Sequence, residues 1–404
     1  MNREESKIVN PDVCIRCATC MGICPVARVT ASFPGPKQAG PGAERFRKPG
    51  DPSVDEWIHL CIGCRLCDTV CSSCVNVSEM NLLAKAKYRD EHGMPLRDWM
   101  FAHNSFVEKL AGRVPRLSNA VLRNPLVRRL LDRLLKIDLR RPLPVYEATT
   151  FRQWFRTHTG RGGKPIGYFY GCYANTHERD VAIAAVQVLE AAGYEVVIPR
   201  QECCGLPALG QGDVGEARRM AERNVPWLLA AVRSGLEIVF TSTSCGHMLK
   251  YEYSRFLEIP DADEVARHLH ELFDYLRDLQ GKGQFDVRFR SRPLRAAYFA
   301  PCHLRSLQIG FPSLDILRRI PELQIEMVDA DCCGMGGLYG FKKEKAPIAD
   351  AIGADLAKAV ERLNVEMVLT ECEGCRMQIQ RLTGLRTLHP IQIVRDALEP
   401  GAGN

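Results

Sequence analysis

Residues 201–207 read QECCGLP, and residues 330–336 read ADCCGMG. These paired cysteines are 129 positions apart, and the single cysteines around them keep almost the same spacing. The cysteines that end FYGC and FAPC are 130 positions apart, as are those that end FTSTSC and LTECEGC. A near-constant offset across three motifs predicts two copies of one domain in the C-terminal part of the chain.

Each cysteine group in these copies follows a strand-like run. The runs are residues 165–171, 194–200, 236–242, 294–300, 323–329 and 365–370. Helical patterns lie between them, for example at 179–193 and 216–232. Alternation of strands and helices predicts a mostly parallel α/β layer in each copy. The carboxyl ends of parallel strands gather ligands, so we expect the cysteines of each copy to converge.

The two copies differ in their number of sulfurs. The second copy has five candidate ligands, Cys302, Cys332, Cys333, Cys372 and Cys375. One tetrahedral metal needs four, so five thiolates favour a multi-iron cluster, with structural zinc and a spare thiol as the alternative. The first copy has four, Cys172, Cys203, Cys204 and Cys245, because Ser242 stands where the second copy has Cys372. A smaller cluster, zinc or no metal all remain open there. The nearby His247 is more typical of a hydrogen-bonded structural residue than of a ligand.

The N-terminal part carries two further cysteine motifs, CIRCATCMGICP at 14–25 and CIGCRLCDTVC at 61–71. Both have the C-x2-C-x2-C-x3-C spacing of bacterial ferredoxins, in which the fourth cysteine of each motif binds the other cluster. We therefore predict two [4Fe–4S] clusters, one held by Cys14, Cys17, Cys20 and Cys71 and the other by Cys61, Cys64, Cys67 and Cys24. Zinc sites space their cysteine pairs differently. Cys74 is a spare thiol that could replace Cys71.

The composition fits this interpretation. The chain has 404 residues, of which 18 are cysteine, and its N-terminus is acidic without an apolar core, so no secretory signal is predicted. In a reducing compartment thiols serve as metal ligands rather than disulfides. No uncharged apolar run is long enough for a membrane-spanning helix.

The paired-cysteine domains resemble the cysteine-rich domains of the heterodisulfide-reductase type. In that family five such cysteines hold a non-cubane [4Fe–4S] cluster, which the resemblance implies for the second copy. The whole chain is similar to the C subunits of anaerobic glycerol-3-phosphate dehydrogenases. This similarity rests on FPGPKQAGP at 33–41, LLKIDLRRPLP at 134–144, YGFKKE at 339–344, AIGADL at 351–356 and LHPI at 388–391.

The resemblance implies an electron-transfer role without catalytic residues in this chain. The chain would take electrons from flavin-containing dehydrogenase subunits and pass them to membrane menaquinone. It would also tether the complex peripherally to the cytoplasmic face of the inner membrane. Two alternatives are a thiol–disulfide reductase and the iron–sulfur subunit of a glycolate or lactate oxidase. Nucleic acid is not expected as a partner, because no recognised binding module accompanies the basic charge.

That basic charge is concentrated in residues 97–156, which hold 13 Lys or Arg and five Asp or Glu. We predict an amphipathic helix over 125–137. Its apolar residues would be Leu126, Val127, Leu130, Leu131, Leu134 and Leu135, flanked by Arg128, Arg129, Arg133 and Lys136. The helix could pack on its own domain, lie on anionic lipid or dock the flavin subunits.

Together these patterns predict an α+β multidomain chain. A mainly helical two-cluster ferredoxin domain at 1–96 is followed by a basic amphipathic linker at 97–160. Two duplicated α/β cysteine-rich domains follow, at 161–290 and 291–404.

Overall fold

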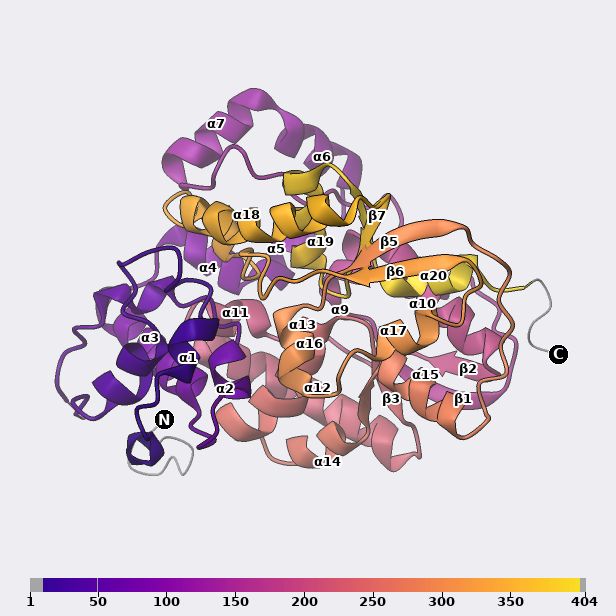
Figure 1. Ribbon diagram of the computed structural model, residues 1–404, viewed down its shortest axis with the longest axis horizontal. Coiled ribbons are helices and arrows are strands. Elements are labelled where there is room, and N and C mark those ends of the chain that lie inside the picture. Colours follow the sequence, from indigo (N-terminus) through magenta and orange to yellow (C-terminus); the bar gives the residue numbers. More distant parts are fainter. Residues whose placement is uncertain (1–9, 49, 400–404) are drawn as a thin grey trace.

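The computed structural model describes residues 10–48 and 50–399 (Figure 1). The N-terminal part is built from short helices and one longer one, α3. Its elements are η1 (Pro11–Val13), α1 (Thr19–Ile23), η2 (Gln38–Gly42), η3 (Glu56–Leu60), α2 (Leu66–Thr69) and α3 (Val77–His92). It contains no strand among the described residues, in agreement with the mainly helical domain predicted from the sequence.

The middle of the chain is also helical. Its helices are α4 (Leu96–Ala102), α5 (Asn104–Ala111), α6 (Pro115–Arg123), α7 (Pro125–Leu134) and α8 (Phe151–Phe155). In Figure 1, α6 and α7 project at the top, beyond α18 of the C-terminal domain. None of the helices in residues 10–48 and 50–399 is long and apolar enough to cross a membrane.

The predicted amphipathic helix is α7. The side-chain oxygen of Asn124 caps its start by accepting hydrogen bonds from the backbone N–H groups of Leu126 and Val127, at 2.8 and 3.4 Å. One sequence expectation is wrong here: Arg128 is not part of a solvated basic face. It is buried, and its guanidinium donates to the backbone carbonyls of Leu139 at 2.9 Å and Arg141 at 2.5 Å.

The two C-terminal copies each form a four-stranded parallel sheet. The first contains β1 (Lys164–Phe169), β2 (Tyr194–Val197), β3 (Ile238–Phe240) and β4 (Leu269–Glu271), in the order β2-β1-β3-β4. The second contains β5 (Leu294–Tyr298), β6 (Leu323–Met327), β7 (Met367–Leu369) and β8 (Arg386–Leu388), in the order β6-β5-β7-β8. The equivalent order confirms the duplication. All six predicted strands form, whereas β4 and β8 were missed because their sequences, LHE and RTL, contain charged and polar residues instead of an apolar run.

Helices connect the strands of both sheets. Those of the first copy are α9 (Gly171–Thr176), α10 (Arg179–Ala191), α11 (Leu206–Gly210), α12 (Val214–Arg233), α13 (Thr243–His247), η4 (Met248–Phe256), α14 (Ala262–Arg267) and α15 (Leu272–Gly281). Those of the second are α16 (Cys302–Leu307), α17 (Pro312–Leu317), η5 (Tyr339–Phe341), α18 (Ala346–Leu363), α19 (Glu373–Thr383) and α20 (Pro390–Asp396). The two copies pack directly on each other, because α20 of the second lies against α10 of the first.

The glycine after each cysteine pair has a steric reason. Gly205 and Gly334 have φ angles of +87° and +80°, which side-chain-bearing residues rarely adopt. A Cβ atom on Gly334 would also lie 2.3 Å from the carbonyl oxygen of Ala349. Glycine therefore allows the backbone to turn sharply directly after each cysteine pair.

Candidate iron–sulfur sites

The cysteines of both copies lie just beyond the carboxyl ends of strands, as the sequence predicted. In the second copy, Cys302 follows β5, the pair Cys332–Cys333 follows β6, and Cys372 follows β7. The sulfurs of Cys333 and Cys375 are 3.0 Å apart. The pKa of Cys302 is raised by its contact with Cys332 and by burial, and the Cys372 sulfur raises it further. All five predicted sulfurs are thus brought together.

The first copy repeats this arrangement with four sulfurs. Those of Cys172 and Cys203 are 3.9 Å apart, and contact with Cys203 and Cys245 raises the pKa of Cys204. Helix α5 covers this group, since the side-chain oxygen of Asn104 is 3.8 Å from the Cys203 sulfur. Sequence reasoning missed this contact, because nothing in the pattern of α5 marks it as a neighbour of the cysteines.

Ser242 occupies the position that Cys372 has in the second copy. Both residues are the N-cap of the helix that follows, α13 or α19. The Ser242 hydroxyl accepts a hydrogen bond from the backbone N–H of Cys245 at 3.3 Å and donates to the carboxylate of Glu373 at 3.2 Å. The serine oxygen is therefore engaged in capping and in a contact between the two copies.

His247 is a structural residue in this fold. Its ring hydrogen-bonds to Glu252 at 3.1 Å and to Ser306 at 2.8 Å, and it stacks on His303 with 5.3 Å between ring centroids. These contacts support the interpretation that it is not a ligand.

In each ferredoxin set, the fourth cysteine of one motif lies beside the first three cysteines of the other. Burial raises the pKa of Cys20, and the sulfurs of Cys14, Cys17 and Cys71 raise it further, so these four side chains are neighbours. All four line one small pocket, whereas Cys74 is exposed and does not line it. Burial raises the pKa of Cys67, and the nearby Cys64, Cys61 and Cys24 raise it further. The four cysteines of the second set therefore also lie close together.

The second ferredoxin set lies directly beside the second copy. After burial, the Cys332 sulfur is the largest cause of the raised pKa of Cys64. A buried ion pair between Arg65 and Glu252 of η4 ties the same loop to the first copy. The second ferredoxin set and the cysteines of the second copy, which the whole first copy separates in the sequence, thus lie side by side, which spacing alone could not reveal.

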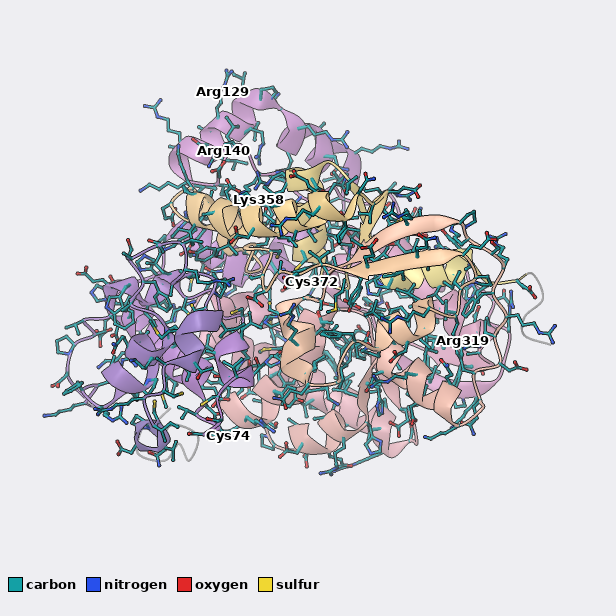
Figure 2. All side chains as sticks on the ribbon, in the orientation of Figure 1. Cys74, Arg129, Arg140, Arg319, Lys358 and Cys372 are labelled. Carbon is teal, nitrogen blue, oxygen red and sulfur yellow. The ribbon has the colours of Figure 1, made fainter. Side chains whose placement is uncertain are left out.

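A cavity of about 570 Å³ connects the second ferredoxin set with the cysteines of both copies. Its wall contains all nine cysteines of the two copies together with Cys61 and Cys64. In Figure 2, Cys372 lies at the centre of the molecule, where the domains meet. Among the described residues, no group of three or more His, Cys, Asp and Glu side chains is arranged to hold a single metal ion. Soft thiolates gathered around a common space fit the donor chemistry of iron–sulfur clusters.

Comparison with known proteins agrees with these sites. Residues 11–75 match the 4Fe-4S dicluster domain, and residues 166–250 and 296–380 each match the cysteine-rich domain called CCG. The C subunit of the anaerobic glycerol-3-phosphate dehydrogenase of Escherichia coli K12 is 35% identical over 95% of this chain and 98% of its own length. The chain belongs to the family of anaerobic glycerol-3-phosphate dehydrogenase C subunits. As a member of this family it is an iron–sulfur protein that serves electron transfer within a multi-subunit dehydrogenase.

This family is itself related to other iron–sulfur proteins. The B subunit of the fumarate reductase (CoM/CoB) of Methanothermobacter marburgensis is 28% identical over 91% of this chain and 67% of its own length. A probable glycolate oxidase iron–sulfur subunit of Bacillus subtilis is 25% identical over 93% of this chain and 89% of its own length. Similarity along most of the chain therefore extends to proteins named for different substrates.

Proposed function

We propose that this chain carries electrons from flavin-containing subunits that oxidise glycerol 3-phosphate to a membrane quinone, with menaquinone as the expected acceptor. The observation that carries the proposal is that Cys64 and Cys332 line one cavity and that Cys24 and Cys332 pack in one hydrophobic cluster, so the ferredoxin part adjoins the second cysteine-rich copy. Continuous cysteine sites of this kind suit a chain of electron carriers, which leaves the substrate chemistry to a partner.

The proposed ligands follow the geometry of the four sites. Two [4Fe–4S] clusters would be held by Cys14, Cys17, Cys20 and Cys71 and by Cys61, Cys64, Cys67 and Cys24. The five sulfurs of the second copy would hold a non-cubane [4Fe–4S] cluster. The first copy offers four sulfurs and a serine already engaged in capping, so its site would differ in content from the second.

Electrons would enter at the first ferredoxin set. It lies at the surface, where Cys17 is exposed beside Val13 and Ile15, whose side chains are 46% and 68% exposed. Exposed apolar residues beside a redox site suit the docking of a partner subunit. We therefore place the flavin subunits at this end of the chain.

Membrane attachment would use exposed apolar side chains of the segment that contains α5, α6 and α7. These are Phe106, Leu110, Val114, Leu117, Val121, Leu126, Leu130 and Leu134, which together we call the outer apolar face. The exposed side chains of Arg129 and Arg133 lie on the same helix, and Figure 2 shows Arg129 projecting at the tip of the molecule. Apolar side chains bordered by cations match an anionic lipid surface, so we choose lipid over a protein partner for this face.

The test is anaerobic purification of the complex in which this chain occurs, followed by assays with glycerol 3-phosphate or glycolate as donor and a menaquinone analogue as acceptor. We expect electron flow from glycerol 3-phosphate that stops when this chain is removed. Preference for glycolate would favour the oxidase alternative, and disulfide reduction by the chain alone would overturn the proposal. About twelve irons per chain are expected from three four-iron clusters, or about sixteen if the first copy is also filled.

A further inference from the structure

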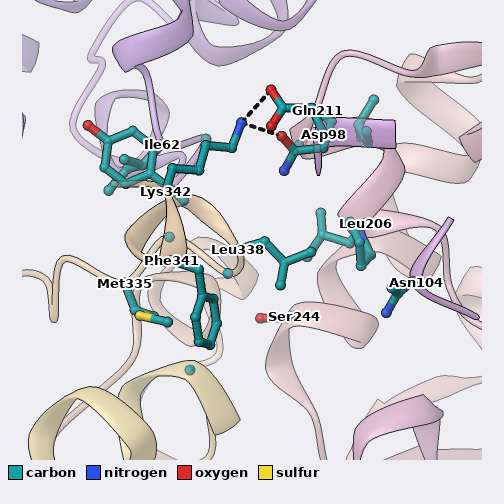
Figure 3. A pocket seen from close by; sticks show the side chains of 18 of the residues that line it. Ile62, Asp98, Asn104, Leu206, Gln211, Ser244, Met335, Leu338, Phe341 and Lys342 are labelled. Carbon is teal, nitrogen blue, oxygen red and sulfur yellow. Dashed lines mark hydrogen bonds and ion pairs between the residues drawn. The ribbon is translucent and has the colours of Figure 1, made fainter. Parts of the chain in front are cut away.

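The central cavity continues beyond the cysteines into a chamber with apolar walls. Its lining there includes Leu206, Met335, Leu338 and Phe341. Figure 3 shows Leu338 between Phe341 and Leu206, with Ser244 below. These residues come from α11 and from the loop that precedes α18, so the chamber lies between the two copies. A ligand in it would be surrounded mainly by apolar side chains, as small-molecule sites usually require.

Among the three lysines that line the cavity, Lys342 places a well-fixed ammonium group close to these apolar residues. The Nζ atom of Lys342 donates to Asp98 at 2.9 Å and to Gln211 at 2.6 Å, as Figure 3 shows. An ammonium has three N–H groups, and these two hydrogen bonds use two of them. Asp98 and Gln211 thus hold the lysine in place and leave its third N–H for a ligand with a carbonyl or other acceptor oxygen.

The chamber is separated from the outer apolar face by one helix. Asn104 and Glu108, one turn apart on α5, line the cavity, whereas Phe106 and Leu110 lie on the other side of the same helix. The latter two side chains are 60% and 59% exposed. A hydrophobic ligand that reaches this face from lipid would therefore have only a short distance to travel to the cysteines.

We propose that the chamber binds the head group of a quinone, with Lys342 donating a hydrogen bond to one of its carbonyl oxygens. The inference rests on the proposed function, because it locates the acceptor which that function requires. A quinone is flat and apolar apart from two carbonyl acceptors, which matches the apolar residues Leu206, Leu338 and Phe341 beside the fixed donor Lys342. Its reduction to quinol takes up two electrons, supplied by oxidation of glycerol 3-phosphate, and two protons, taken from solvent.

The test measures binding of a non-reducible alkyl-hydroxyquinoline N-oxide to the intact complex by fluorescence quenching. Leu338→Trp should fill the chamber, and Lys342→Gln should remove the ammonium; each should raise the dissociation constant at least tenfold. Lys343→Gln is the matched control, since the neighbouring Lys343 is 52% exposed and pairs with Asp132 instead. Iron content and the electron paramagnetic resonance spectra of the clusters report whether each variant is correctly assembled.

The outcomes separate the site from the function. If the wild-type complex reduces quinone but both chamber variants bind the analogue with unchanged affinity, the site is wrong and the proposed function stands. If the wild-type complex neither binds the analogue nor reduces quinone, the proposed function fails with it. If Leu338→Trp blocks reduction of a disulfide such as dithiobis(nitrobenzoate) and leaves analogue binding intact, the chamber serves thiol chemistry and the quinone proposal is overturned.

Discussion

The outer face of α7 allows membrane attachment to be tested without disturbing the fold. Leu126, Leu130 and Leu134 are 70%, 54% and 66% exposed, which together equals about two fully exposed leucine side chains. Burying a leucine is worth about 2 kcal/mol, so transfer of this surface to lipid is worth up to about 4 kcal/mol. Replacing all three with glutamine should weaken vesicle binding by up to about a thousandfold.

The protein should still fold, because glutamine is a good helix former and exposed substitutions usually change stability by less than about 0.5 kcal/mol each. The assay is co-sedimentation of the purified protein with vesicles of phosphatidylglycerol and phosphatidylcholine. Val54→Gln and Met327→Gln are controls, since these residues are exposed on other parts of the surface. Unchanged binding by the triple variant, with normal binding by the controls, would refute membrane attachment through α7.

Four further predictions concern charge, acid stability, a buried ion pair and a cluster ligand. The double substitution Arg129→Glu and Arg133→Glu should weaken binding to anionic vesicles only. An equal loss of binding to neutral vesicles would contradict the proposed attraction of these arginines to anionic lipid. Burial lowers the pKa of His389 to about 3. Below about pH 6.5 the unfolded state therefore binds a proton that the folded state does not. The contribution of His389 to the free energy of unfolding should fall by about 1.4 kcal/mol for each pH unit of acidification. In urea unfolding, His389→Gln should show a shallower pH dependence. Arg141→Met should cost about 3 kcal/mol in the same assay, because Arg141 is 1% exposed, pairs with Asp350 at 2.8 Å and donates to Gln378 at 2.7 Å. A loss below about 1 kcal/mol would contradict this. Cys333→Ser should remove one cluster's paramagnetic signal and abolish quinone reduction, while the ferredoxin signals persist.

The two hydrogen bonds of the His389 ring explain why we expect its protonation to lower the stability of the fold. Its Nδ1 accepts the backbone N–H of Ile391 at 3.1 Å, and its Nε2–H donates to the carbonyl of Thr241 at 3.1 Å. Protonation of Nδ1 would break the first hydrogen bond, which caps α20. Protonation therefore removes the cap of α20 within the second copy, whereas the Nε2–H bond to Thr241, which joins the two copies, needs no neutral ring.

The sequence alone determined the duplicated domains, six of the eight strands and the grouping of the cysteines. These are local patterns: strand ends follow short apolar runs, and the ferredoxin spacing dictates which cysteine is too far along its helix to bind the same cluster. The strands β4 and β8 were beyond this approach, because LHE and RTL lack the apolar run that marks the equally short β3 and β7.

Only the tertiary structure decided which side of α7 faces solvent and which groups meet in the centre. Arg128 and Arg129 are adjacent and chemically identical, yet the first binds backbone carbonyls in the interior and the second projects outward. In the same way, Lys342 faces the chamber and Lys343 faces α7. Such choices depend on partners far away in the sequence, and no local pattern records them. The presence of Cys64 and Cys332 in the wall of one cavity has the same origin, since it arises only when the helical domain packs against the second copy.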